Sequence, residues 1–325
     1  MKAAIWTKYG PPDVLQVREI EKPTPKDDEV LIRICATTVT AGDCEMRSLK
    51  ISPMLRLPMR LYVGFTRPIR ITILGQELAG EVEATGKDVK LFKEGDQVFA
   101  APGFRLGAYA KYICLAEKPA GGALALKPAN LTCEEAAAIP IGGFEALHFL
   151  RQAEIQPGQN VLIYGAGGSI GTIAIQLARS YGAEVTGVDR GDKLDMLRSI
   201  GADHVVDYTR EDFTQSNQSY DVIFDVVGKS PFSGSLRALK PGGCYLIANP
   251  SLRAMARQRL ASRGRKVILG TSSYSSEDLV YLRELIEAGK IKPVIDRRYP
   301  LEQIAEAHRY VEAGGKKGNV IIVMK

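Results

Sequence analysis

The sequence has 325 residues, of which 45% are hydrophobic and 25% are charged. At about 100–200 residues per domain this length predicts two domains, and the composition excludes a mainly disordered, collagen-like or coiled-coil architecture. The net charge of +6 is spread along the chain, and so mild an excess does not by itself indicate a nucleic-acid partner.

The first 125 or so residues are predicted to be rich in β-structure. Apolar runs bounded by glycine and proline predict strands over 30–36, 78–84 and 108–115, and a turn followed by a strand over 93–100. We expect this region to form a compact, barrel-like β domain.

From residue 161 onward the pattern alternates between strands and helices. This alternation is typical of a doubly wound parallel sheet, so the predicted fold class is α/β. We expect the final strand, 320–323, to return to the β domain. Strands are predicted over 161–164, 184–189, 204–207, 220–226, 244–248 and 266–270, and helices over 169–181, 193–200, 232–239 and 276–288.

Three features of the sequence predict the compartment of the protein and the redox state of its cysteines. No apolar stretch of about 20 residues predicts a transmembrane helix, and the first residues have no signal-peptide core. The five cysteines include no CxxC pair, which favours reduced thiols. We therefore expect a cytoplasmic protein.

A glycine-rich turn carries the strongest chemical signal. Its GxxGxxG spacing follows a predicted strand and opens a predicted helix, where backbone N–H groups and the helix dipole bind a pyrophosphate. The sequence therefore predicts a dinucleotide site. The predicted binding run is Gly165, Ala166, Gly167, Gly168, Ser169, Ile170 and Gly171.

Residues near the adenosine ribose leave the choice of coenzyme open. Asp189 ends the next strand, where an acidic side chain favours NAD(H). Arg190, Lys193 and Tyr208 lie close to the same predicted pocket, where cations favour NADP(H). Two residues at the ends of later strands complete the predicted coenzyme site, Val227 and Ala248.

Seven segments together resemble the medium-chain dehydrogenase/reductase superfamily, and most of all its zinc-free quinone oxidoreductase and alkenal/enone reductase branch. The resemblance implies a split GroES-like domain over 1–127 and 273–325, a Rossmann domain over 128–272, a cleft between them and a homodimer. The segments are 1–17, 39–43 (VTAGD), 74–80 (LGQELAG), 107–112 (GAYAKY), 134–143 (EEAAAIPIGG), 161–171 and 201–208.

The zinc ligands of the family's alcohol dehydrogenases are not matched. Thr40 stands at the first cysteine position, and the GHE motif becomes Gly75, Gln76 and Glu77. Threonine and glutamine are poor Zn²⁺ ligands, so we expect no metal. The three histidines, at 148, 204 and 308, are interpreted as packing or surface residues.

Without a metal to polarise a carbonyl, a conjugated acceptor is the better substrate. In an enone or quinone, conjugation carries the charge of the incoming hydride to an oxygen that hydrogen-bond donors stabilise. We expect a small lipophilic carbonyl or quinone. The candidate catalytic residues are Thr40, Asp43, Gln76, Arg47 (from a D-x-x-x-R pattern that also fits an Asp43–Arg47 ion pair) and Tyr62 in a predicted loop over 49–70.

Two features do not fit this interpretation completely. Glu145 stands where the family often has threonine beside the nicotinamide, and its carboxylate would either face away or stabilise the oxidised ring. The basic segment 251–266 has helical spacing of apolar residues. A solvated helix is the favoured interpretation, with RNA or anionic membrane contact as the alternative. Two other functions therefore stay open: a dinucleotide-binding protein without turnover, and an alcohol dehydrogenase with unusual metal ligands.

Overall fold

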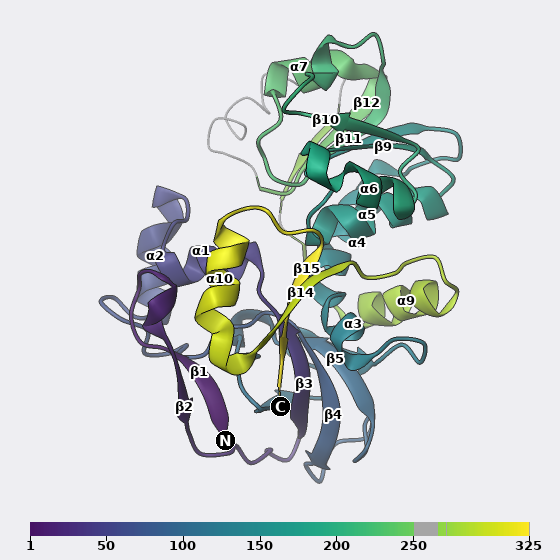
Figure 1. Cartoon of the computed structure of the whole chain (residues 1–325). Helices are drawn as coiled ribbons and strands as arrows, with labels where there is room; N and C mark the ends of the chain where they lie inside the picture. The colour runs from purple at the N-terminus through teal and green to yellow at the C-terminus, as the bar shows by residue number, and fades with distance from the viewer. Residues whose placement is uncertain (250–265, 271, 325) are drawn as a thin grey trace. The chain divides into compact units, whose positions relative to one another are not determined.

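The computed structural model describes residues 1–249, 266–270 and 272–324. Two compact units are formed (Figure 1), one by Met1–Ile141, Tyr274–Glu287 and Pro293–Lys325, the other by Gly142–Ser273 and Ala288–Lys292. Apart from Lys266, the predicted basic segment lies outside the described residues. Within the described ranges no helix is both long enough and apolar enough to cross a membrane.

A seven-stranded sheet forms the centre of the first unit. Its order is β14-β15-β3-β4-β5-β7, with β6 also paired to β3, and β1 pairs separately with β2. The strands are β1 (Lys2–Trp6), β2 (Leu15–Glu19), β3 (Glu29–Thr38), β4 (Leu78–Thr85), β5 (Gln97–Ala101), β6 (Tyr112–Ala116), β7 (Ala123–Leu126), β14 (Ile295–Pro300) and β15 (Asn319–Val323). The α-helices are α1 (Ala41–Ser48), α2 (Pro53–Val63), α3 (Cys133–Ala137), α9 (Ser276–Glu287) and α10 (Ile304–Glu312).

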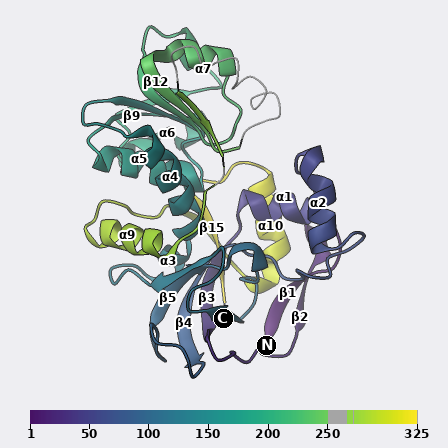
Figure 2. The ribbon, with the colours of Figure 1, turned by 180° about the vertical axis from the view of Figure 1, so that it is seen from behind.

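The long strand β3 organises this sheet. Its apolar residues include Val30, Ile32 and Ile34, which are buried in one hydrophobic cluster with side chains of β4 and β5. Figure 2 shows β3, β4 and β5 side by side. The C-terminal strand β15 pairs antiparallel with β3, so the chain end returns to the β-rich unit as predicted.

Three predictions for the first unit need correction. Residues 49–70 contain the helix α2 where a loop is predicted, because Pro53 starts a run of leucine, methionine and arginine, all good helix formers. The strand predicted over 108–115 begins at Tyr112. Residues 128–141, assigned from the sequence to the Rossmann domain, pack with the first unit, since α3 lies against β3 and β4.

The second unit is a six-stranded parallel sheet in the order β10-β9-β8-β11-β12-β13, and it confirms the predicted α/β fold class. In both views α5 and α6 cover one face and α7 lies on the other (Figures 1 and 2). The strands are β8 (Asn160–Tyr164), β9 (Glu184–Asp189), β10 (His204–Asp207), β11 (Tyr220–Asp225), β12 (Leu239–Ile247) and β13 (Lys266–Leu269). The α-helices are α4 (Pro140–Ala153), α5 (Ser169–Ser180), α6 (Leu194–Ser199) and α7 (Phe232–Ala238).

Candidate functional site

The glycine-rich turn joins β8 to α5 at the carboxyl edge of the parallel sheet, where ligands of such sheets bind. Gly165 has a φ of +81°, and a Cβ there would lie 2.9 Å from Val227 Cγ1. A Cβ on Gly171 would lie 2.5 Å from the carbonyl oxygen of Gly165. Glycine at these two positions therefore lets the turn close tightly against both α5 and Val227.

Gly168 occupies the N-cap of α5 and has a different role. Among the described residues, no side chain caps this helix end. The nearest described atom to a Cβ built on Gly168 would be the Gly165 carbonyl oxygen, 3.8 Å away. The described atoms therefore leave room beside the positive end of a helix dipole, which suits a pyrophosphate. The predicted turn fits a dinucleotide on this observation.

Asp189, at the end of β9, binds the backbone of the glycine-rich turn. Its Oδ2 accepts a hydrogen bond from the Gly167 N–H at 2.7 Å, and its Oδ1 accepts one from the Arg190 N–H at 2.8 Å. The Lys193 ammonium lies 3.1 Å from Oδ1, and both side chains are less than a tenth exposed. Asp189, which favours NAD(H), and Lys193, which favours NADP(H), thus form an ion pair with each other, and their charges cancel.

Two further side chains, those of Arg190 and Tyr208, lie near this pair. The Arg190 guanidinium forms a bidentate ion pair with the Asp192 carboxylate, and both N–O distances are 3.0 Å. Tyr208 is 46% exposed, and its ring lies 6.0 Å from that of Tyr164. The backbone N–H of Tyr208 donates to the Asp189 carbonyl. The end of β10 therefore lies at the same carboxyl edge of the sheet as the end of β9.

The sequence analysis missed Asp225, whose buried carboxylate holds the backbone at the edge of the sheet. Its carboxylate, 1% exposed, accepts hydrogen bonds from the backbone N–H groups of Val227, Gly228, Lys229 and Ser230 at 2.8–3.3 Å. Its carbonyl accepts from the Ala248 N–H. The signal was an aspartate ending a buried strand just before a glycine-containing turn. This residue positions both Val227 and Ala248 at the sheet edge.

In the first unit, Thr40, Asp43 and Gln76 lie together as predicted. The Thr40 hydroxyl accepts from the Asp43 N–H at 3.0 Å and from the Gln76 amide at 2.7 Å, and it donates to Asp43 Oδ2 at 2.7 Å. Asp43 Oδ1 accepts from the Gly75 N–H at 3.0 Å. Asp43 is fully buried, and burial raises the pKa of its carboxyl. Thr40 is therefore the N-cap of α1 and forms a capping box with Asp43, while Gln76 keeps a second amide N–H.

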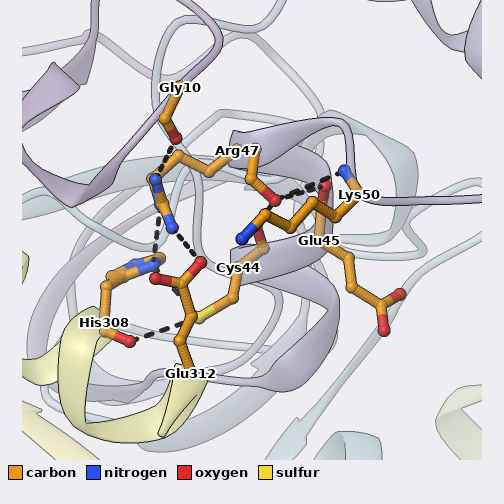
Figure 3. Close-up of polar contacts among 8 residues, drawn as sticks. Gly10, Cys44, Glu45, Arg47, Lys50, His308 and Glu312 are labelled. Atoms are coloured by element: carbon orange, nitrogen blue, oxygen red, sulfur yellow. Dashed lines mark hydrogen bonds and ion pairs between the residues drawn. The ribbon is translucent and has the colours of Figure 1, made fainter.

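Arg47 does not form the ion pair with Asp43 that was the alternative to a catalytic role. Its buried guanidinium pairs with Glu312 of α10 and donates to the Gly10 carbonyl (Figure 3). Its Nε lies 3.3 Å from His308 Nδ1. Burial, with the neighbouring arginine, lowers the pKa of His308 to about 3. Helix geometry explains the correction, because Asp43 is occupied at the N-terminus of α1 and Arg47 reaches from the last turn to α10.

Tyr62 lies in α2 and is 42% exposed, with the Arg70 guanidinium 5.1 Å from its ring centre. It forms no part of the Thr40 cluster. The structure thus brings three of the five candidate catalytic residues together and places Arg47 and Tyr62 elsewhere in the first unit.

Glu145 lies within α4 in the second unit. Its Oε1 accepts a hydrogen bond from the Ser272 hydroxyl at 2.6 Å, and burial raises the pKa of its carboxyl. The carboxylate thus binds a hydroxyl group of its own unit.

Glu77 matches the glutamate of the family's GHE motif, and its side chain is buried, with 1% exposed. Its Oε1 accepts from the Thr38 hydroxyl, and its Oε2 accepts from the Ile141 N–H at 2.8 Å, in the first turn of α4. Burial is the largest effect on this carboxyl and raises its pKa to about 7. Glu77 therefore fastens the start of a helix.

Replacing Glu77 with glutamine should change how the free energy of unfolding depends on pH. The folded-state pKa of about 7 exceeds the ordinary value of 4.5, so the folded chain binds this proton more tightly than the unfolded chain. This carboxyl therefore lowers stability as pH rises from about 4.5 to about 7. Relative to wild type, the variant should gain about 2–3 kcal/mol across that window.

Urea unfolding at several pH values measures the effect of Glu77→Gln. The exposed Glu94→Gln is the matched control and should follow wild type at each pH. A difference between wild type and Glu77→Gln that stays constant with pH would contradict the prediction.

The residues at the family's metal position do not fit zinc. Thr40 and Gln76 are hydrogen-bonded to each other, and neither offers a ligand that Zn²⁺ prefers. Among the described residues, no three His, Cys, Asp or Glu side chains gather as a metal site. All five cysteines are free thiols.

Comparison with known proteins places the chain in a family. Residues 26–125 match the alcohol dehydrogenase GroES-like domain, and residues 200–322 match a domain described as zinc-binding dehydrogenase. A 2-methylene-furan-3-one reductase of Solanum lycopersicum is 32% identical over 99% of this chain and 79% of its own. The chain belongs to the medium-chain dehydrogenase/reductase superfamily. The resemblance predicted from the sequence is confirmed.

Two further relatives show to which branch of the superfamily the chain belongs. An NADPH-dependent alkenal/one oxidoreductase of Arabidopsis thaliana is 30% identical over 99% of this chain and 79% of its own. The solved structure of a quinone oxidoreductase from Coxiella burnetii has a TM-score of 0.87 at 28% identity, covering 100% of this chain and 99% of that one. The chain is therefore an oxidoreductase of the quinone and alkenal/enone reductase branch. These relatives do not favour a role in binding alone.

Proposed function

We propose that this oxidoreductase transfers a hydride from NADPH to a quinone or an α,β-unsaturated carbonyl. The observation that carries the proposal is the N-terminus of α5, where the described atoms leave room beside Gly168 and Asp189 binds the backbone of the turn. When bound there, the reduced coenzyme supplies the hydride. The relatives named above act on acceptors of this class.

The chain's own groups have two tasks in this proposal. The N–H groups at the start of α5 hold the pyrophosphate. In the first unit, Thr40 fixes one N–H of the Gln76 amide, and we assign the second N–H to the oxygen that gains charge when hydride arrives. A donor already oriented by a buried neighbour needs little reorganisation, which is how such groups lower a barrier.

Coenzyme choice follows from the charges around Asp189. The carboxylate that would repel a 2′-phosphate is neutralised by Lys193 at 3.1 Å. The Arg190 side chain is 40% exposed and pairs with Asp192, which is itself 48% exposed. A guanidinium is well suited to bind a phosphate. The preferred reductant is therefore NADPH.

Replacing Arg190 with alanine should lower the ratio of kcat/KM for NADPH to that for NADH by about tenfold, which corresponds to the loss of one charge-assisted contact. The matched control is Arg198→Ala in α6, whose partner is the exposed Asp195; it should leave the ratio unchanged. Steady-state rates with both coenzymes measure the effect. An unchanged ratio in Arg190→Ala would contradict this assignment of the 2′-phosphate.

The activity itself is tested by following the absorbance of reduced nicotinamide with a quinone and with a short enone. The assay is run in buffer that contains a chelator. Consumption of NADPH that depends on the acceptor supports the proposal, and no consumption with any acceptor of either class would overturn it.

We further propose that the oxidoreductase works as a homodimer in the cytoplasm. The superfamily resemblance supports the dimer, and β13 at the end of the six-stranded sheet offers an edge for pairing. The free thiols of the five cysteines support a reducing compartment. Light scattering of the purified protein and fractionation of cells test the two statements separately.

A further inference from the structure

The helix α2 and the turn after it present a large apolar surface to solvent. Leu61 is 71% exposed, Met54 is 66% exposed and Leu57 is 57% exposed. Their spacing of three and four residues places them on one side of the helix. The other exposed apolar side chains of the segment are Leu55, Tyr62, Phe65 and Ile69.

The opposite side of α2 is anchored to the first unit. Val63 is completely buried in the core that also contains Trp6 and Leu74. The Tyr9 hydroxyl donates to the Gly64 carbonyl at 2.7 Å, which fixes the end of the helix. Both views show α2 at the periphery of this unit (Figures 1 and 2). The exposed apolar face is therefore held outward by a buried anchor.

The charges of this segment all have one sign. Residues 50–70 contain five cations and no carboxylate. The Arg60 guanidinium lies 5.7 Å from the Phe65 ring centre, and that of Arg70 lies 5.1 Å from the Tyr62 ring centre. These contacts keep positive charge beside the apolar face. The five cations are Lys50, Arg56, Arg60, Arg67 and Arg70.

We propose that residues 50–70 dock this protein on the surface of an anionic phospholipid bilayer. A helix that carries leucine and aromatic side chains on one side and arginines around them lies in the plane of a membrane interface. Its apolar side chains enter the boundary between headgroups and acyl chains, while the arginines bind lipid phosphates. Charge complementarity selects an anionic surface. The inference does not rest on the proposed reductase activity.

The test uses the full chain and two kinds of vesicle, one of phosphatidylcholine alone and one of phosphatidylcholine mixed with phosphatidylglycerol. Flotation measures the bound fraction. We expect binding to the mixed vesicles to be at least about tenfold stronger than to the neutral ones. Equal binding to both, or no binding to either, would overturn the proposal.

Variants assign the binding to α2. Leu57→Ser combined with Leu61→Ser should reduce binding to mixed vesicles by about tenfold or more, and Arg56→Gln combined with Arg67→Gln should reduce it only where anionic lipid is present. The matched control, Leu91→Ser, changes a leucine 56% exposed outside the segment and should bind as wild type does. Circular dichroism checks the fold of each variant.

Two outcomes would overturn the assignment even if wild type binds vesicles. Undiminished binding of the leucine variants would assign the membrane contact to other basic residues, such as those in 251–266. A change in oligomeric state in these variants, with unchanged vesicle binding, would assign the face to a second copy of the chain.

Discussion

Replacing Asp225 with alanine should lower the free energy of unfolding by about 3–5 kcal/mol. The substitution removes the acceptor shared by four consecutive backbone N–H groups, those of residues 227–230. Because the site is 1% exposed, water does not replace the lost oxygens without rearrangement of the loop. Urea unfolding followed by far-ultraviolet circular dichroism measures the loss.

The matched control is Asp195→Ala. Asp195 is fully exposed and pairs with Arg198 one turn along the same helix, so its loss should leave the unfolding midpoint unchanged. Asp225→Asn keeps one oxygen but presents an amide N–H₂ to other donors, so it should fall between wild type and Asp225→Ala. An unfolding midpoint for Asp225→Ala equal to that of the control would contradict the role assigned to this carboxylate.

Much of the second unit could be predicted from the sequence because its signals are local. A buried strand, a glycine-rich turn and an apolar helix lie consecutively between residues 160 and 180. The strand that ends at Asp189 is equally clear. Asp189 and Lys193 are only four positions apart, yet the sequence could not decide whether they pair. Whether an acid faces a ribose or a neighbouring ammonium depends on side-chain direction at the end of β9.

The first unit was harder because its decisive contacts join distant residues. Arg47 pairs with Glu312, which lies 265 positions away, and no local spacing distinguishes that partner from Asp43. Glu77 supports Ile141 across 64 positions. The capping box formed by Thr40 and Asp43 could have been predicted from the sequence, because a threonine followed three residues later by an acidic residue is a pattern that starts a helix. The D-x-x-x-R pattern directed attention away from it.

The helix α2 illustrates a different difficulty. Its prolines and its position between predicted strands favoured a loop, but Pro53 stands in the first turn, where its missing N–H has no partner to lose. Pro58 lies inside the helix. The exposed leucines gave no amphipathic pattern directed at a core, because most of the apolar side chains face solvent. A helix whose apolar face is not used within its own unit is not recognised by a rule that assumes burial.

Replacing Gly168 with aspartate should reduce the affinity for NADPH by at least about 100-fold while the fold stays as stable as wild type or becomes more stable. An aspartate at the N-cap of α5 accepts hydrogen bonds from the N–H groups of the first turn and favours the positive end of the dipole. The described atoms leave room for the side chain. The same carboxylate occupies the space of the pyrophosphate and repels its charge.

Gly168→Asn separates charge from shape. Asparagine has nearly the same size and is an equally good N-cap, so it should stabilise the helix to a similar degree but weaken NADPH binding less than aspartate does. Calorimetric titration gives the affinities, and thermal unfolding without coenzyme gives the stabilities. If Gly168→Asp binds NADPH as wild type does, the pyrophosphate does not lie at this turn. If aspartate and asparagine weaken binding equally, the obstruction is steric and the helix dipole is not the main source of affinity. A stable protein that loses the coenzyme only when the cap is charged would locate the phosphate at the start of α5.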